Sequence, residues 1–358
     1  MVFLGDLVHK HPETRHTDCA RQEGSLAWTA KSVQKEMHLI RSPATFLRSP
    51  YVPQPTLADG DVAVLGVPYD EGTTGRAGAR EGPHALRTIS GQWAYREDGE
   101  ACWDGEAELS LLGGVRFVDT GDVYLPPTAQ PEVSFPLIGV RLAELLRSGL
   151  FPVVLGGDHS ITYPLLLGVE RVRGERTPPV QLVQFDAHMD YWNDIGGEFF
   201  THASPIIRAH EDEVAGRIVQ YGIRSLHTAA DNVELARERG VITHWCEPVQ
   251  RQMREYGIGR LLEDVEPDVD TWLTIDIDCL DPAIAPGTGV PEPGGFTYYE
   301  ARALLRGVAE RANVIGMDLV EVSPRYDPGE LAALHGVRLI LDAVGAVFEK
   351  RKQPDFFF

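Results

Sequence analysis

The sequence predicts an α/β protein with three layers (αβα), in which a mainly parallel β-sheet is covered by helices on both faces. Short apolar runs rich in valine, leucine and isoleucine alternate with segments of helical periodicity along most of the 358 residues. Such alternation is typical of parallel sheets that are buried on both faces. Several apolar runs also end directly at aspartate or histidine, and ligand sites of these sheets lie at the carboxyl ends of the strands. No linker interrupts the pattern, which favours one main domain.

The expected strands are the short apolar runs that lie between turn residues. The run Val180 to Gln184, for example, is rich in valine and follows Pro178 and Pro179. Runs of this kind are typical of covered strands. A turn at residues 120–122 is expected to follow the second strand. The full set is 62–67, 115–118, 153–155, 180–184, 217–223, 240–246, 271–276 and 314–319.

The expected helices lie between these strands. Pro83 suits the first position of a helix that runs to about Tyr95. Ser160 is placed to cap the helix that follows it. Elsewhere apolar residues recur every three to four positions, which is the helical period. The full set is 83–95, 131–149, 161–169, 229–239, 249–262, 299–311 and 330–349.

The first part of the chain differs from the rest. Residues 1–41 are polar and mixed in charge, with a helical apolar period only between Ala27 and Ile40. We predict an N-terminal arm over 1–41 and the main domain over 42–358. Arms of this kind often pack on neighbouring subunits in oligomers, and a partly ordered tail is the alternative.

Composition excludes several classes of function. The formal net charge of -20 disfavours nucleic acid and anionic membrane surfaces, because both would repel the chain. No apolar run approaches the length of a membrane span, and Met1 to Lys10 lacks the apolar core of a signal peptide. The four cysteines are far apart without paired spacing, which indicates reduced thiols and a cytoplasmic location.

Three metal-capable side chains follow the expected strand 180–184. Asp186, His188 and Asp190 are spaced at i, i+2 and i+4, so they share one face if the backbone stays extended. Carboxylate oxygens with an imidazole suit a divalent cation such as manganese, zinc, nickel or iron. Taken alone, this triplet is equally compatible with a solvated polar loop.

Two further strand ends favour the metal interpretation. His159 follows the strand 153–155 and a glycine turn, and Asp276 and Asp278 end the strand 271–276. Six candidate ligands therefore come from three strand ends. One cation rarely takes so many, whereas two cations that share bridging carboxylates use them naturally.

The blocks Gly156–Ser160, Asp186–Asp190 and Asp276–Pro282 resemble the signatures of the ureohydrolases, the arginase and agmatinase family. The segment 285–295 is similar to the agmatinase-like branch, which includes guanidine and biguanide hydrolases. The resemblance covers roughly residues 42–349 and implies an arginase-like fold for the ureohydrolase catalytic domain. Further matching segments are 66–70, 76–83 and 318–324.

The resemblance implies two divalent metal ions per chain, manganese by family default and nickel as the alternative. Asp186 and Asp276 would bridge the ions, and Asp190 would also belong to the catalytic residues. One ion would be held by His159, Asp186, Asp190 and Asp276. The other would be held by His188, Asp186, Asp276 and Asp278.

Substrate residues are also implied by the resemblance. Glu321 matches the glutamate that binds guanidinium, a planar cation that suits paired charge-assisted hydrogen bonds. His202 stands where relatives have a histidine that transfers a proton to the leaving amine. Thr73 and Thr74, in a glycine-rich loop over 70–83, are expected to contact substrate. That loop lacks the lysine of a phosphate-binding loop.

Other polar groups near these motifs receive structural roles. Cys279 has no histidine partner at a suggestive spacing, so we interpret it as a small apolar filler rather than a nucleophile. Asp158 and Asp281 are expected to accept hydrogen bonds behind the ligands or to cap turns.

The implied reaction is hydrolysis of a guanidino C–N bond to urea and ammonia or an amine. Tyr191, Trp192, Phe199, Phe200 and Val290 predict apolar walls, which would leave a charged substrate tail unpaired. A small substrate is therefore expected: guanidine, an N-alkylguanidine or a biguanide such as metformin. An agmatinase or guanidinobutyrase is one alternative, and a noncatalytic subunit of a hetero-oligomeric ureohydrolase is another. A homo-oligomer, trimer or hexamer by resemblance, is expected, with a hetero-oligomer as the alternative.

Overall fold

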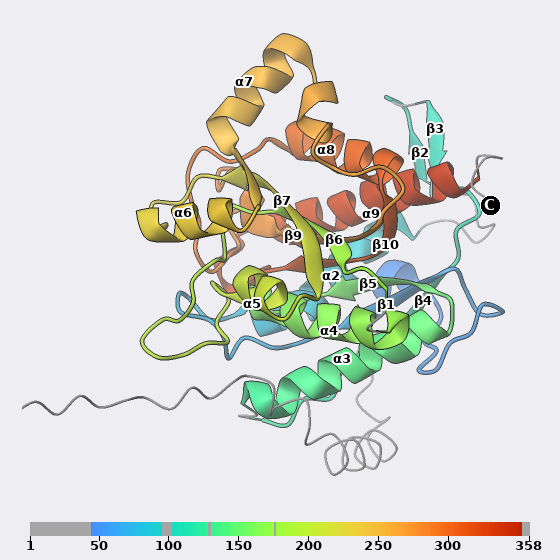
Figure 1. Ribbon diagram of the computed structural model, residues 1–358. Coiled ribbons are helices and arrows are strands. Elements are labelled where there is room, and N and C mark those ends of the chain that lie inside the picture. The colour runs from blue at the N-terminus through green and yellow to red at the C-terminus, as the bar shows by residue number, and fades with distance from the viewer. Residues whose placement is uncertain (1–43, 95–101, 107, 128–129, 175–176, 353–358) are drawn as a thin grey trace, which may run out of the picture. The chain divides into compact units, whose positions relative to one another are not determined.

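The computed structural model describes residues 44–94, 102–106, 108–127, 130–174 and 177–352. The arm predicted over residues 1–41 lies outside the described part and remains a prediction. A sheet of eight strands, in the order β4-β1-β5-β10-β9-β6-β7-β8, forms the centre (Figure 1). Every pairing within it is parallel. The strands are β1 (Val62–Gly66), β4 (Phe117–Asp122), β5 (Phe151–Leu155), β6 (Val180–Phe185), β7 (Ala215–Ile223), β8 (Ile242–Trp245), β9 (Asp270–Asp276) and β10 (Asn313–Val320).

Helices cover both faces of this sheet, as the sequence predicts. On one face α9 packs against α2 and α8, and on the other face α4 packs against α3 and α5 (Figure 1). Strand residues of both faces are buried and mostly aliphatic. The helices are α2 (Gly82–Ser90), α3 (Pro131–Arg147), α4 (Thr162–Arg173), α5 (Pro205–Glu211), α6 (Ala230–Glu238), α7 (Cys246–Tyr256), α8 (Tyr298–Arg311) and α9 (Leu331–Arg351).

Helix α9 is the one helix in the described part of the chain that is long and apolar enough to cross a membrane. Its apolar side chains, such as Val337, Ile340 and Val344, lie in the core of the fold. Burial of this helix between the sheet, α2 and α8 accounts for its composition, because a helix that is apolar nearly all round is stable inside a large core.

The structure corrects several expected boundaries. Strand β4 starts at Phe117 and continues through residues 120–122, where a turn was predicted. The helix expected over 249–262 begins at Cys246 and is interrupted at Gly257, whose φ of 74° belongs to the left-handed region. Helix α2 ends at Ser90, and a 3-10 turn continues it to Trp93. Glycine adopts the left-handed region without strain, which makes it a common helix terminator.

Two elements were not predicted. Helix α5 is a short helix that begins at Pro205. An antiparallel hairpin joins β2 (Cys102–Asp104) to β3 (Leu109–Leu111). Arg302 of α8 forms ion pairs with Asp104 and with Glu106 of the hairpin turn. Both elements are too short for a periodic apolar pattern, which is the main signal of secondary structure in a sequence.

The order of the strands brings distant segments together at one edge of the sheet. Strands β5, β10, β9 and β6 are neighbours at its centre. Their carboxyl ends are followed by the segments around His159, Glu321, Asp276 and Asp186 respectively. The fold therefore collects all of the expected ligand segments at the place where parallel sheets bind ligands.

Candidate metal centre

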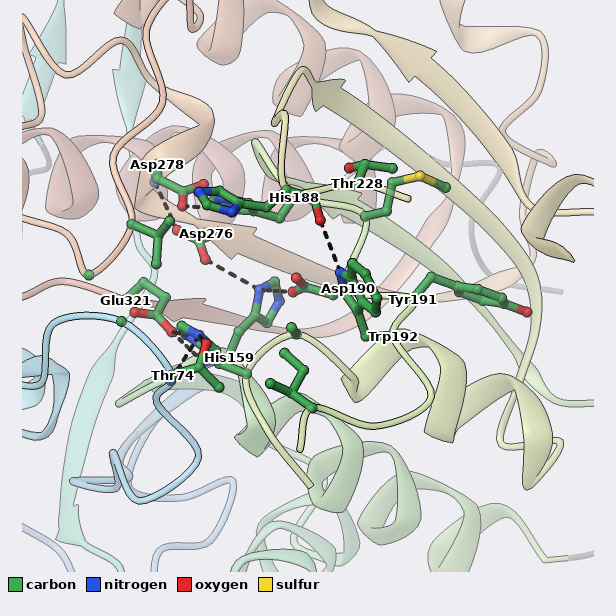
Figure 2. Close-up of a pocket in the computed structure, with 18 of the residues that line it drawn as sticks. Thr74, His159, His188, Asp190, Tyr191, Trp192, Thr228, Asp276, Asp278 and Glu321 are labelled. Atoms are coloured by element: carbon green, nitrogen blue, oxygen red, sulfur yellow. Dashed lines mark hydrogen bonds and ion pairs between the residues drawn. The ribbon is translucent and has the colours of Figure 1, made fainter. Parts of the chain in front are cut away.

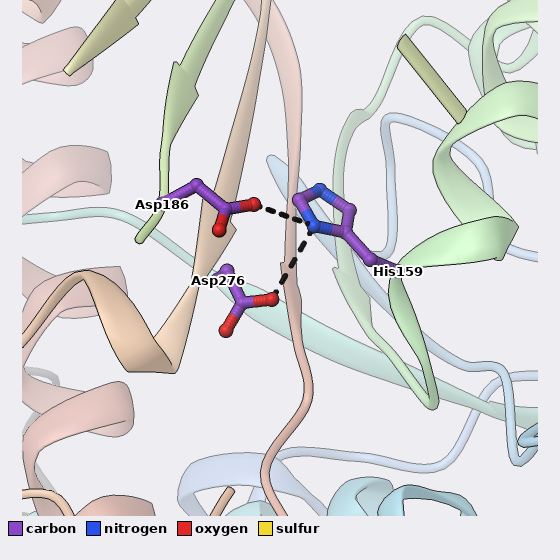
Figure 3. A group of neighbouring side chains, drawn as sticks. All are labelled: His159, Asp186 and Asp276. Atoms are coloured by element: carbon purple, nitrogen blue, oxygen red, sulfur yellow. Dashed lines mark ion pairs between the residues drawn. The ribbon is translucent and has the colours of Figure 1, made fainter. Parts of the chain in front are cut away.

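The first half of the centre is built around His159. Its Nδ1 lies 2.9 Å from Asp186 Oδ2, 2.9 Å from Asp190 Oδ2 and 3.3 Å from Asp276 Oδ2. Figure 3 shows the Asp186 and Asp276 carboxylates converging on this nitrogen. The residues come from a 3-10 turn after β5, from the loop after β6 and from the end of β9.

The second half of the centre is built around His188. Its Nδ1 lies 3.1 Å from Asp278 Oδ2 and 3.4 Å from Asp186 Oδ1. Asp186 therefore presents one oxygen to each histidine. Asp276 turns Oδ2 toward His159, while its Oδ1 accepts a hydrogen bond of 2.8 Å from the Asp278 amide. Five of the six residues expected to bind metal thus form two adjoining groups that share Asp186, and Asp190 joins the His159 group through its Oδ2.

Two residues of the site have an unusual backbone. Asp190 (φ 50°) and Glu321 (φ 63°) both adopt the left-handed region, although neither is glycine. Such conformations cost of the order of 1–3 kcal/mol and persist where the surrounding structure enforces them, often at functional sites. The chain turns at Asp190 and is no longer extended there. The expectation that Asp186, His188 and Asp190 share one face of an extended strand is therefore only partly met.

The electrostatics of the cluster favour cations. Burial, and then the neighbouring Asp278 and Asp186 carboxylates, raise the pKa of Asp276 well above its usual value. Burial and Asp186 raise the pKa of Asp190 to about 7. Burial raises the pKa of Asp186 too, but the neighbouring His159 and His188 imidazoles outweigh burial and the pKa falls. Like charges this close repel, and bound cations relieve that repulsion.

The donor set fits divalent metal ions. Nδ1 of His159 is buried and has no hydrogen-bond partner in the described part of the chain, yet carboxylate oxygens face it from three sides. Buried polar atoms are normally paired, so such an atom requires an explanation. Imidazole nitrogen with several carboxylates is a donor set for Mn²⁺, Ni²⁺, Co²⁺ or Zn²⁺.

Glu321 lies beside this cluster. Its Oε1 accepts hydrogen bonds from the His159 amide (3.0 Å) and from His202 Nδ1 (2.9 Å). Its Oε2 is buried and has no hydrogen-bond partner among the described residues. One oxygen therefore fixes the carboxylate, and the other remains to accept a hydrogen bond from a ligand in the cavity.

His202 is held at both ring nitrogens. Nδ1 faces Glu321, while Nε2 accepts a hydrogen bond from the Thr74 amide (3.1 Å) and lies 2.8 Å from the Thr74 hydroxyl. Burial lowers the pKa of His202, but the Glu321 carboxylate outweighs burial and raises the pKa to about 9. The Thr74 amide donates a hydrogen bond to Nε2 of the neutral ring, and the Thr74 hydroxyl oxygen can accept one from Nε2–H of the protonated ring. Thr74 can therefore hydrogen-bond His202 in both protonation states.

Replacing His202 with alanine is expected to lower turnover by about 10²-fold or more, which is the contribution of a positioned proton donor. Metal content should stay that of the parent, because His202 contacts Glu321 and Thr74 rather than the cluster. Metal analysis and initial rates on the same preparation check both statements. An unchanged rate would show that water or another group delivers the proton.

The cluster forms the floor of a cavity of about 850 Å³ (Figure 2). Thr74 and Val290, two of the expected substrate contacts, line it together with Arg76 and Asp194. Thr73 does not line the cavity, and its role remains a prediction. Gly75 packs against Val290, since a Cβ at Gly75 would lie 2.7 Å from Val290 Cγ2. The glycine thus allows the rim loop to approach the loop that carries Val290.

The expected aromatic walls are only partly present. Trp192 lines the cavity, and so does Tyr191, although its hydroxyl bonds to His210 Nδ1 (2.7 Å) and points away from the cluster (Figure 2). Phe199 and Phe200 do not line it. The ring of Phe200 packs on Phe135 and Tyr163 instead (ring centroids 5.5 and 6.0 Å). The prediction of four aromatic wall residues was therefore wrong for these two. Phe200 packs on α3 and α4 instead, and Phe199 is exposed and contacts the Arg208 guanidinium.

Other expected roles agree with the structure. Asp158 accepts hydrogen bonds from the amides of Gly72 and Ser160, so it joins the rim loop to the strand end. Asp281 accepts from the amides of Ala283, Gly294 and Gly295, as a turn-capping residue does. Burial raises the pKa of the Cys279 thiol well above its usual value, which opposes a nucleophilic role.

The site combines four carboxylates with two imidazoles, and one aspartate faces both histidines. In an α/β fold, such a donor set is typical of a metal-dependent hydrolase. The arginase family model matches residues 60–345. The chain therefore belongs to the arginase family of ureohydrolases, whose members are metal-dependent amidinohydrolases.

Individual relatives agree with this assignment. An agmatinase of Photorhabdus laumondii is 35% identical over 321 residues, which are 89% of this chain and 97% of that protein. The structure of proclavaminate amidino hydrolase from Streptomyces clavuligerus has a TM-score of 0.74 at 31% identity, over 86% of this chain and 97% of that chain. Trypanosoma cruzi formiminoglutamase with two Mn²⁺ shares the fold, with a TM-score of 0.71 at 21% identity over 85% and 98% of the two chains.

Proposed function

We propose that this protein hydrolyses a guanidino C–N bond and releases urea with ammonia or an amine. The observation that carries the proposal is the free oxygen of Glu321. Among the described residues this buried carboxylate oxygen has no hydrogen-bond partner, and it lies in a cavity that both histidines and three of the four expected aspartate ligands also line. It provides what a planar guanidinium needs: a charge-assisted acceptor beside the metal ligands.

Two divalent cations are part of the proposal, with Mn²⁺ as the expected ion and Ni²⁺ as the alternative. When bound, such a pair lowers the pKa of a shared water toward neutrality and thereby supplies a hydroxide nucleophile. Membership in the arginase family, for which manganese is the default ion, supports the choice of Mn²⁺. One ion would be held by His159, Asp186, Asp190 and Asp276. The other would be held by His188, Asp186, Asp276 and Asp278.

The chain's own residues would orient the substrate and move the proton. Glu321 Oε2 accepts N–H groups of the guanidinium, and the bond from His202 to Oε1 keeps that carboxylate in place. His202 then delivers a proton from Nε2 to the departing nitrogen, while Thr74 is positioned to hydrogen-bond the neutral ring that remains. Guanidinium is stabilised by resonance, so its hydrolysis depends on this fixed geometry between nucleophile and leaving group.

For the substrate we propose guanidine, an N-alkylguanidine or a biguanide such as metformin. The cavity walls near the metal ligands include Met189, Trp192, Ile195, Val290 and Pro291. Apolar walls leave a charged tail without partners, which costs free energy on binding, whereas they accommodate a short or uncharged substituent.

Agmatine or 4-guanidinobutyrate is the second candidate, and two residues favour it. Asp194 is exposed and lines the cavity, so it could pair with the ammonium group of agmatine. Arg76 also lines the cavity and is fixed by the carbonyl oxygens of Thr288 (2.7 Å) and Gly289 (3.3 Å). It could pair with the carboxylate of guanidinobutyrate. The identity to proteins named agmatinase supports the first of these tails.

A substrate panel tests the choice. Guanidine, methylguanidine, metformin, agmatine, arginine and 4-guanidinobutyrate are compared at equal concentration with urea as the readout and kcat/KM as the score. We expect the small guanidines to be preferred and Asp194→Asn to leave their KM unchanged. A clear preference for agmatine, with a KM that rises in Asp194→Asn, would refute the small substrate and leave the proposed chemistry intact.

The remaining alternative is a noncatalytic subunit. A cluster of buried carboxylates is costly without cations. This chain has all six expected ligands, and they lie together, which favours a catalytic chain. We also propose a homo-oligomer in the cytoplasm, supported by the family resemblance and by the absence of disulfides among the described cysteines. Urea release by the purified single chain separates an enzyme from a subunit that needs a partner.

A further inference from the structure

A row of polar side chains crosses the sheet directly beneath the metal ligands. Its members occupy matched positions on five neighbouring strands, because Gln220 pairs with Thr243 and Gln184, Gln184 pairs with Thr274, and Thr274 pairs with Asp318. The residues before and after the row on β6 and β9 are apolar and buried. We call this set the polar row: Thr243, Gln220, Gln184, Thr274 and Asp318.

One end of the polar row holds the loop that follows β6. Gln184 donates from Nε2 to Asp186 Oδ2 (2.7 Å) and to the His188 carbonyl (3.4 Å). Gln220 donates from Nε2 to Gln184 Oε1 (2.6 Å) and to the Met189 carbonyl (2.7 Å). The Thr243 hydroxyl donates to Gln220 Oε1 (2.9 Å). The two amides thus contact three of the five residues from Asp186 to Asp190.

The direction of these bonds is fixed. A carboxylate that faces a cation only accepts hydrogen bonds, so Gln184 must present its NH₂ group to Asp186 and its oxygen to Gln220. Gln220 in turn has its oxygen free for Thr243. Both amides are fully buried, and each donor and acceptor has a partner. A fully bonded buried network of this kind holds its members in one arrangement.

The other end of the polar row holds His159. The Thr274 hydroxyl donates to Asp318 Oδ1 (2.6 Å) and lies 2.9 Å from His159 Nε2. Asp318 also accepts from the Trp272 indole (2.6 Å) and the Thr162 hydroxyl (3.1 Å). Since the Thr274 proton is given to Asp318, its oxygen is left to accept from Nε2–H. The imidazole then carries its proton on Nε2 and turns the Nδ1 lone pair toward the three carboxylates.

We propose that Gln184 and Gln220 are positioning residues for the metal centre. They fix the carboxylate shared by both histidine groups and the loop that carries His188 and Asp190, as Thr274 and Asp318 fix His159. Groups that orient metal ligands typically change metal affinity by about 10- to 100-fold when they are removed. The inference rests on the proposed metal centre and concerns residues that do not themselves contact metal or substrate.

The test compares Gln184→Met with Gln181→Met. Methionine keeps the length of glutamine and removes both polar groups. Gln181 lies on the same strand at its other end, is equally buried, and bonds to Thr271 Oγ1 (2.9 Å) and to the Glu266 amide (2.8 Å). It is therefore a matched control for the loss of a buried, bonded glutamine. Each protein is stripped with chelator and titrated with Mn²⁺, and the melting temperature is measured with and without the metal.

We expect both variants to lower the melting temperature of the metal-free protein, and only Gln184→Met to weaken Mn²⁺ binding, by about 10- to 100-fold. Gln220→Met loses the bonds to Gln184 and Met189 and should also weaken Mn²⁺ binding. It replaces Gln184→Met in the test if that variant does not fold. The inference would be overturned if Gln184→Met and Gln220→Met both bound Mn²⁺ with the affinity of the parent. It would also be overturned if Gln181→Met lost as much affinity as Gln184→Met. A parent protein that binds no Mn²⁺ would instead overturn the proposed metal centre.

Discussion

Replacing Asp276 with alanine is expected to abolish urea release and to leave at most one divalent ion per chain. Asp276 faces His159 with one oxygen and accepts the Asp278 amide with the other, so its loss removes a ligand and loosens the next one. Asp186 cannot take over the bridging role proposed for Asp276, because its two oxygens already face the two histidines. Activity that depends on two cations should fall below detection.

Metal stoichiometry and urea production are measured together on the Asp276→Ala protein. Asp281→Ala is the matched control for metal content, since Asp281 is an aspartate of the same segment that bonds backbone amides instead of facing the cluster. It should retain two ions per chain. Two retained ions and near-normal turnover in Asp276→Ala would refute the binuclear assignment.

The second large effect is expected for Glu321→Gln. Glutamine keeps the shape and can still accept from the His159 amide, but it removes the negative charge that faces guanidinium. Loss of one partner of a buried charge pair costs about 2–5 kcal/mol, and each 1.4 kcal/mol is a factor of ten. The position of His202 also depends on this carboxylate. We therefore expect kcat/KM to fall by roughly 30- to 4,000-fold.

Metal content separates this role from a structural one. Glu321 is not among the expected ligands, so Glu321→Gln should keep both ions and its affinity for Mn²⁺. Steady-state kinetics with the preferred substrate then show whether kcat, KM or both have changed. Retained activity together with retained metal would place guanidinium recognition elsewhere in the cavity.

The architecture was predictable because its strands are strongly apolar. Runs such as Val62 to Leu65 and Val180 to Val183 are fully buried, and such runs are clear signals in a sequence. Strand ends were less predictable, as β4 shows: Thr120, Gly121 and Asp122 are typical turn residues, yet they extend a strand. There Arg87 pairs with Asp119 and Asp122, and this tertiary contact outweighs local preference.

The candidate ligands were predictable for a different reason. Asp186, His188, Asp276 and Asp278 are polar residues placed directly after apolar strands, and the fold class brings such ends together. The direction of a side chain was not predictable in the same way. Phe200 follows the ligand loop closely in sequence, but its ring packs on Phe135 and Tyr163, because contacts with α3 and α4 are visible only in three dimensions.

The polar row was missed although the sequence contains a signal for it. Gln184, Thr274 and Asp318 interrupt runs that are otherwise apolar, and buried polar residues are uncommon unless they are bonded. The sequence alone cannot show that they are neighbours, since the order β10-β9-β6-β7-β8 departs from chain order and matched register is a property of the assembled sheet.

The polar row also has a consequence for how the chain reaches its native pairing. In a strand, moving the register by one residue exchanges the two faces. A slip of β6 would place Val183 or Phe185 opposite Gln220 and Thr274. Gln184 Oε1 and Gln220 Nε2 would then lose the hydrogen bond that joins them and would face an apolar layer. Each such group costs about 1–3 kcal/mol. The residues proposed to orient the metal ligands therefore also distinguish the correct alignment of β6 and β7 from its one-residue alternatives. A chain that has aligned these strands has, by the same bonds, preassembled this part of its site.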